Sequence, residues 1–319
     1  RTIIRVSFCM KISFLTWIAL GLLVSNAAAQ NAKPAPGEAE DKNRIVLDVT
    51  RVNLLFTVSD KKGRFVTDLG RGDFQIFEDK KQQQIHEFTA ETGLPLRLAI
   101  LIDTSNSIRE RFRFQQEAFT QFVRDVVRPR QDKAIVVSFD SSAELVADLT
   151  DDTQKLESAI RELRPGGGTA LYDAIFFACR DKLMLDQPLY KFRRAMVVLS
   201  DGDDNVSRYT RDQALEMAQK ADVVIYTIST NMTRIETEGD KVLKYFGAET
   251  GGLSFFPFKA TDLEQSFQNI ANELRHQYNL FYRPEPLIAD GKYHSVQLKV
   301  KDRKDLVVRS RKGYYAPKL

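Results

Sequence analysis

Oxygen-bearing side chains follow the end of an apolar segment in the stretch LAILIDTSNS, residues 98–107. Alternate residues of an extended segment point the same way, so Asp103, Ser105 and Ser107 can direct three oxygens at one point. Two other segments offer similar groups, because the glycine-rich RPGGGTALYDA contains Thr169 and VVLSDG contains Asp201. Two carboxylates and three hydroxyls suit Mg²⁺ or Mn²⁺, whereas a softer metal would need His or Cys, and neither is placed for that. The sequence therefore predicts a divalent-cation site formed by these five residues.

The segments that must position these residues alternate between apolar strands and helices. The strand patterns are RLAILID, KAIVVSFD, RRAMVVLSD and DVVIYTIST, and the first intervening helix carries apolar residues at spacings of three, four and seven from Phe112 to Val126. This alternation predicts a mostly parallel sheet covered by helices on both faces. Open sheets of this kind bind ligands at the carboxyl ends of their strands, where Asp103 and Asp201 are expected.

These motifs carry a resemblance to a known family. The D-x-S-x-S at 103–107, Thr169 in its glycine-rich loop and Asp201 in SDG are similar in order and spacing to the metal-ion-dependent adhesion site of von Willebrand factor type A (VWFA) domains. The flanking segments FTVSDKKGRFVTDLGRGDFQIFED and GKYHSVQLKVK resemble those of secreted bacterial VWFA-related proteins. The resemblance implies that the two serines and Thr169 bind the ion directly, while Asp103 and Asp201 hold it directly or through water.

Short strand patterns lie on both sides of the α/β region. We expect an α/β fold with a doubly wound, mostly parallel sheet of VWFA or Rossmann-like type over residues 95–277. Residues 45–92 and 278–319 are each too short for a secure core of their own, and domain termini often lie close together. We therefore expect them to pack as one β-sandwich-like module, in which DFQIFEDKKQQQIHEFTAE supplies two short strands around a polar turn.

The first residues have the layout of a secretory signal peptide. From Met10 the chain has one basic residue, an apolar run over residues 12–24 and then three alanines. We expect residues 1–29 to be this peptide, with Met10 as the true start, and residues 30–44 to be a flexible linker rich in Pro, Ala and charge. The apolar run is short for a membrane span, so the mature chain is expected to lack a transmembrane segment and to be secreted or periplasmic.

Composition and charge argue against several classes of protein. The 47 basic and 43 acidic residues are spread along the chain without a basic stripe, so no nucleic-acid partner is expected. The glycines at 166–168 lack the following lysine of a phosphate-binding loop. His86, His276 and His294 lie in unrelated patterns and are expected at the surface or half-buried. Cys179, the one cysteine after the predicted signal peptide, is expected to be a small buried side chain.

Three functions are compatible with these features. Neutral hydroxyl ligands leave a bound ion much of its charge and one free coordination position, which favours capture of a carboxylate. The leading hypothesis is an exported adhesion or binding module that takes an Asp or Glu of a protein partner through the ion. A metal-dependent hydrolase is less favoured, because the sequence has no G-x-S-x-G and no histidine near the end of a strand, so no enzyme activity is expected. A structural envelope protein with a vestigial site is the third alternative, and the sequence predicts neither a particular partner nor an oligomeric state.

Overall fold

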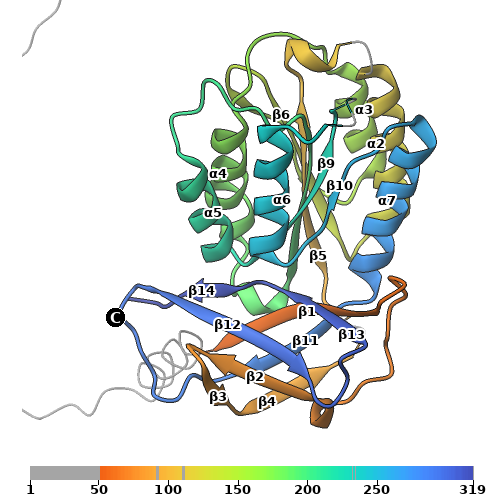
Figure 1. Cartoon of the computed structure of the whole chain (residues 1–319). Helices are drawn as coiled ribbons and strands as arrows, with labels where there is room; N and C mark the ends of the chain where they lie inside the picture. The colour runs from red at the N-terminus through yellow and green to blue at the C-terminus, as the bar shows by residue number, and fades with distance from the viewer. Residues whose placement is uncertain (1–50, 91–92, 110–111, 232, 234, 319) are drawn as a thin grey trace, which may run out of the picture. The chain divides into compact units, whose positions relative to one another are not determined.

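The computed structural model describes residues 51–90, 93–109, 112–231, 233 and 235–318. The predicted signal peptide and linker lie outside these residues. The described chain forms three sheets, one mostly parallel and two antiparallel (Figure 1).

The mostly parallel sheet has six strands in the order β10-β9-β8-β5-β6-β7. All of its pairings are parallel except that of β6 with β7. All eight residues of both β5 and β8 are buried, as expected for central strands covered on both faces. The strands are β5 (Leu96–Asp103), β6 (Lys133–Phe139), β7 (Ala143–Thr150), β8 (Arg193–Ser200), β9 (Val223–Ser229) and β10 (Ser254–Phe255).

Helices cover both faces of this sheet. Those on one face are α2 (Phe112–Val126), α3 (Thr153–Glu162) and α7 (Ala260–Arg275), whose apolar side chains share a core with one side of the strands. Those on the other face are α4 (Leu171–Asp181), α5 (Arg211–Lys220) and α6 (Glu238–Thr250) (Figure 1). The predicted doubly wound α/β fold is therefore confirmed. Cys179 is fully buried on α4, and burial raises the pKa of its thiol.

The two antiparallel sheets form a β module with its own apolar core. One sheet has the order β13-β1-β11-β4 and the other β14-β12-β2-β3, so each combines strands from before and after the α/β region. This confirms the expected sandwich-like module made from both terminal segments, while its exact boundaries stay predictions. Its strands are β1 (Val52–Asp60), β2 (Phe74–Glu78), β3 (Lys81–Gln83), β4 (Ile85–Thr89), β11 (Tyr278–Tyr282), β12 (Tyr293–Val300), β13 (Leu306–Ser310) and β14 (Gly313–Tyr315).

Two segments of the β module contain more strands than the sequence pattern indicates. The segment DFQIFEDKKQQQIHEFTAE forms three strands rather than two, because β2 and β3 form a hairpin and β4 pairs with β11 in the other sheet. The hairpin turns at Asp79 and Lys80, which both have positive φ (43° and 69°), as a tight two-residue turn requires. The segment DLVVRSRKGYY likewise divides into β13 and β14, which belong to different sheets.

The end of α7 is bonded to the β module through a buried carboxylate. Thr57 on β1 donates a hydrogen bond to Oε1 of Glu273 (3.0 Å), and Arg309 on β13 pairs with its Oε2 (3.3 Å). Burial raises the pKa of Glu273, although Arg309 and Thr57 act in the opposite direction. These bonds join a helix of the α/β region to two strands that are far from it in the sequence.

Candidate functional site

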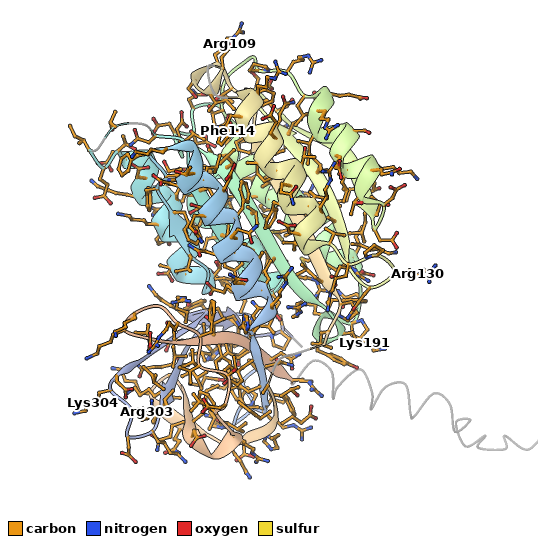
Figure 2. All side chains as sticks on the ribbon, turned by 90° about the vertical axis from the view of Figure 1, so that its right-hand side faces the viewer. Arg109, Phe114, Arg130, Lys191, Arg303 and Lys304 are labelled. Atoms are coloured by element: carbon orange, nitrogen blue, oxygen red, sulfur yellow. The ribbon has the colours of Figure 1, made fainter. Side chains whose placement is uncertain are left out.

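The predicted metal ligands lie at the carboxyl edge of the parallel sheet. β5 ends at Asp103 and β8 ends at Ser200, and the two strands pair in register up to Ile102 and Leu199. The chain therefore leaves the sheet at Asp103 and at Asp201 from neighbouring strands. Figure 2 shows Arg109, from the loop after β5, projecting at this end of the α/β region, away from Arg303 and Lys304 on the β module.

Asp103 is a fully buried carboxylate. Its Oδ1 accepts a hydrogen bond from the Ser105 N–H (2.8 Å), and its Oδ2 accepts one from the Ser200 hydroxyl (2.6 Å). Burial raises the pKa of Asp103 to about 6, the nearby charge of Asp201 acts in the same direction, and the hydrogen bonds oppose both. Among the described residues no Lys, Arg or His forms an ion pair with Asp103 or Asp201. Buried carboxylates are normally paired or bound to metal, so this pair of acids has the character of a cation site.

The two serines lie beside this carboxylate. Ser105 is buried, Ser107 is exposed, and their hydroxyl oxygens are 2.9 Å apart. Asn106, between the two serines, bonds to the glycine-rich loop. Its N–H (3.4 Å) and its side-chain amide (3.2 Å) both donate to the carbonyl of Gly167. The D-x-S-x-S segment and the glycine-rich loop are therefore held together.

Thr169 is buried where the glycine-rich loop enters α4. Its N–H donates to Oδ1 of Asn205 (3.0 Å), and the N–H of Asn205 donates back to the Thr169 carbonyl (3.1 Å). Oδ2 of Asp204 accepts the N–H of Tyr172 in the first turn of α4 (3.0 Å). The loop after β8 thus fixes both Thr169 and the start of α4.

The backbone of Asp201 packs against the start of α6. Its backbone carbonyl lies so close to Gly239 that a Cβ added at Gly239 would be 2.1 Å from it. Gly202 has φ of +83°, and a Cβ there would be 2.2 Å from the Gly239 carbonyl. Only residues without side chains allow this close approach of the loop to the helix start.

The structure thus brings the loops carrying all five predicted ligands to one edge of the sheet. The prediction that these residues coordinate an ion stays a prediction. Sequence reasoning missed Ser200 and Asn205, which hold Asp103 and Thr169 in place. Ser200 ends an apolar strand beside Asp201, and this position was the signal that could have identified it.

Comparison with known proteins agrees with the fold of the α/β region. Residues 98–203 match the family model described as the von Willebrand factor type A domain. Residues 98–203 therefore belong to a VWFA domain. The human von Willebrand factor A domain-containing protein 3B is 28% identical over 169 residues, which cover 51% of this chain but only 12% of that protein.

Solved structures give a similar result for the fold. The von Willebrand factor type A protein from Catenulispora acidiphila, 14% identical, superposes with a TM-score of 0.50 and covers 81% of this chain and 72% of its own. The VWFA domain of the type V pili tip protein Mfa5 from Porphyromonas gingivalis, 15% identical, has a TM-score of 0.48 and covers 57% of this chain and 95% of its own. At these identities the likeness to the first structure shows the fold alone.

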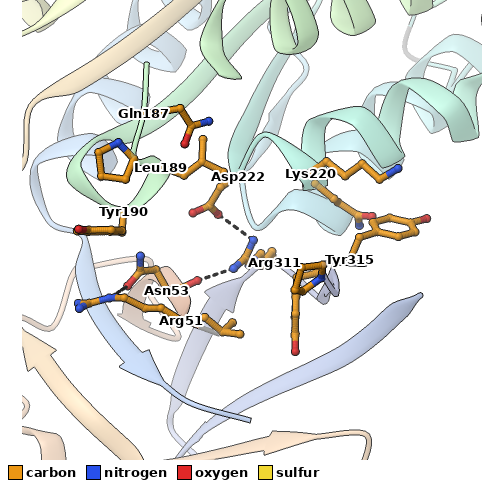
Figure 3. A pocket seen from close by; sticks show the side chains of 14 residues that line it. Arg51, Asn53, Gln187, Leu189, Tyr190, Lys220, Asp222, Arg311 and Tyr315 are labelled. Carbon is orange, nitrogen blue, oxygen red and sulfur yellow. Dashed lines mark hydrogen bonds and ion pairs between the residues drawn. The ribbon is translucent and has the colours of Figure 1, made fainter. Parts of the chain in front are cut away.

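A hollow of about 330 Å³ lies at the opposite end of the VWFA domain, next to the β module (Figure 3). Its basic side chains are already paired within the protein. Arg311 pairs with Asp222 (2.9 Å), and Arg51 bonds to Asn53 and pairs with Glu87. This hollow therefore offers no free charge comparable to that of Asp103 and Asp201.

One histidine departs from the sequence-based expectation. His294 on β12 is only 5% exposed, whereas we expected all three histidines at the surface or half-buried. Its ring lies among carboxylates contributed by a segment more than 200 residues earlier in the chain. Residues so far apart in the sequence form no local motif, so the sequence alone does not indicate this cluster.

Proposed function

We propose that this protein is an exported binding module whose VWFA domain takes an acidic group of a protein partner through a divalent cation. The ligands would be Asp103, Ser105, Ser107, Thr169 and Asp201. The observation that carries the proposal is the buried Asp103 carboxylate, which has no basic partner among the described residues and lies beside a second carboxylate. VWFA domains mediate adhesion and protein-protein interaction, and this supports the same reading.

The donor set fits a hard divalent cation. Carboxylate and hydroxyl oxygens are the ligands that Mg²⁺ and Mn²⁺ prefer. Bound there, such an ion supplies a positive centre with a position open to one carboxylate oxygen of the partner. Ser200 and Asn205 would act as positioning residues, because they bond to Asp103 and to the Thr169 backbone.

The rim of the site would choose the partner. Arg109 is exposed at this edge, where its guanidinium donates to Oδ1 of Asn106 (3.1 Å). Arg208, on the loop after β8, is also exposed but pairs with Asp173 (3.5 Å). Positive side chains around a cation site favour the approach of an acidic partner and raise its association rate. This agrees with capture of an Asp or Glu rather than of a neutral group.

Enzyme activity is not favoured by the arrangement. A metal-dependent hydrolase needs a general base beside the ion. His86 and His294 lie on β4 and β12 of the β module, and His276 follows α7, so none of them is a general base placed at the predicted ligands.

Export is proposed from the signal-peptide pattern of residues 1–29. Among the residues that the structure describes, no helix is long and apolar enough to cross a membrane.

The test measures binding of the full-length protein to matched synthetic peptides. Peptides that contain Asp or Glu and the same peptides with Asn or Gln are immobilised, and retention of the protein is measured with Mg²⁺ and with a chelator. We expect retention only on the acidic peptides, only with Mg²⁺, and not for Asp103→Ala. Calorimetry with Mg²⁺ and Mn²⁺ accompanies the assay. If the folded wild type binds neither ion at millimolar concentration, the proposal fails and a vestigial site takes its place.

A further inference from the structure

We propose that Glu78, Asp79 and His294 form a second metal site, inside the β module and suited to Zn²⁺ or a similar first-row transition metal. One ligand atom from each of the three side chains lies within 4.8 Å of the other two. Glu78 ends β2, Asp79 begins the β2–β3 turn, and His294 lies on β12, which pairs with β2. The site shares no residue with the VWFA edge.

Glu78 presents one free oxygen to the cluster. Its other oxygen, Oε2, accepts hydrogen bonds from the hydroxyls of Tyr282 (2.7 Å) and Tyr314 (3.2 Å). No hydrogen bond among the described residues ends on Oε1, which lies 3.8 Å from Nδ1 of His294. Glu78 as a whole is only 5% exposed, and within the described chain the charged group nearest to Oε1 is the ring of His294. Carboxylates that lie largely out of water are normally paired or bound to a metal ion.

Asp79 and His294 are held in the same manner, with one atom bonded elsewhere and one facing inward. Oδ1 of Asp79 accepts both the N–H and the hydroxyl of Ser295 (2.9 Å each), and Oδ2 lies 2.7 Å from Nδ1 of His294. Nε2 of His294 lies 3.3 Å from Asp290, whose carboxylate accepts the N–H of Lys292 (2.8 Å). Metal-binding histidines usually donate the second ring N–H to a carboxylate in this way, and metal-binding carboxylates are themselves hydrogen-bonded.

Charge balance also favours a bound cation. Three carboxylates, those of Glu78, Asp79 and Asp290, surround one imidazole, and in the described part of the chain their only ion-pair partner is His294. A protonated imidazole offsets one negative charge and leaves two. A divalent cation on Nδ1, with the proton on Nε2, offsets two and can be bound directly by Oε1.

Small side-chain shifts would bring these atoms to the spacing of a four-coordinate ion. Zn²⁺ binds nitrogen and oxygen at about 2.0–2.2 Å, so tetrahedral ligand atoms lie roughly 3.3 Å apart. Nδ1 is 2.7 Å from the Asp79 oxygen and 3.8 Å from the Glu78 oxygen. On metal binding the first pair would therefore open by roughly 0.6 Å and the second would close by roughly 0.5 Å. Imidazole with carboxylates is a ligand set for transition metals, unlike the all-oxygen set at the VWFA edge.

A metal here would fasten the two halves of the β module together. Asp79 and His294 are 215 residues apart and belong to the segments before and after the VWFA domain. Ions bound only by the folded chain stabilise it, so Zn²⁺ should raise the midpoint of thermal unfolding. The inferred role is therefore structural and independent of partner capture.

Calorimetry on the metal-free full chain at pH 7.5 tests the site with Zn²⁺ as the probe. We expect His294→Gln and Glu78→Gln to weaken Zn²⁺ binding at least about a hundredfold, and Asp290→Asn to weaken it about 10- to 100-fold. The matched control is His86→Gln, which removes an exposed imidazole from neighbouring β4 and should change nothing. Asp103→Ala should also keep the site, which separates failure of this proposal from failure of the VWFA proposal.

Nitrogen NMR of the histidine rings in the wild type tests the site even if a variant fails to fold. With one equivalent of Zn²⁺, we expect His294 to carry metal on Nδ1 and a proton on Nε2. Protons on both ring nitrogens in the presence of Zn²⁺ would show that the cluster is a salt bridge and would overturn the proposal. Zn²⁺ binding that survives unchanged in both folded Gln variants would overturn it as well.

Discussion

Asp201 and Thr169 offer different contributions to the proposed VWFA metal site. Thr169→Ala removes one neutral oxygen and should weaken Mg²⁺ binding about tenfold, a loss typical of disturbed metal coordination. Asp201→Ala also removes a negative charge that would offset the ion, so it should weaken binding more than Thr169→Ala does. Calorimetry with Mg²⁺ measures both, and circular dichroism checks the fold.

The control for this pair is Asp212→Ala, which removes an exposed acid from α5 whose ion-pair partner among the described residues is its neighbour Arg211. It should leave Mg²⁺ affinity close to that of the wild type. Equal affinity of Asp201→Ala and wild type would contradict the assignment of Asp201 as a ligand.

Single residues of the VWFA site differ in how far the sequence reveals them. Asp103, Ser105 and Ser107 follow one strand with regular alternation, so their common direction is readable from the sequence alone. Ser200 reaches Asp103 only because β5 and β8 are neighbours, and those two residues are 97 positions apart. The Glu78, Asp79 and His294 cluster depends on the pairing of β2 with β12, which no local pattern indicates.

The start of α6 is the element that fixes Asp201, and this gives a second prediction. Gly239→Ala would place a Cβ 2.1 Å from the Asp201 carbonyl, which is backbone and cannot rotate away. We expect a loss of about 1–3 kcal/mol in the free energy of unfolding, as for other overpacked sites, together with weaker Mg²⁺ binding. Urea unfolding and calorimetry measure the two effects.

Gly72→Ala is the matched control, because a Cβ there meets nothing within 4 Å and its φ is not in the left-handed region. It should change neither stability nor metal binding. If Gly239→Ala behaved as Gly72→Ala does, the packing of α6 on the Asp201 loop would not determine the site.

The elements themselves were predicted unevenly. β5, β6, β8 and β9 are apolar runs long enough to be recognised, because strands covered on both faces need apolar side chains on both. β7 was not predicted, since this edge strand is only partly buried and its pattern is weaker. β3 and β14 have three residues each, too few for an alternating pattern to be distinguished from a turn.

At the scale of the whole molecule, the VWFA domain and the β module are joined by charged pairs as well as by the chain. α7 ends at Arg275 and β11 begins at Tyr278, so the last helix leads into the module within three residues. Glu273, near that helix end, bonds to strands β1 and β13. The described residues belong to one compact unit, in agreement with these bonds.

Substitution of Glu273 should therefore lower the free energy of unfolding of the VWFA domain and the β module together. Glu273→Ala leaves Thr57 and Arg309 without their shared acceptor, and the loss of the acceptor of buried or partly buried donors costs about 1–3 kcal/mol. We expect a loss of that size in urea unfolding, with the protein still unfolding in one transition. Glu273→Gln keeps an oxygen for Thr57 and should lose less. Asp305→Ala breaks the exposed pair with Arg303 and should cost under about 1 kcal/mol. If the two Ala variants lost equal stability, Glu273 would not join the VWFA domain to the β module energetically.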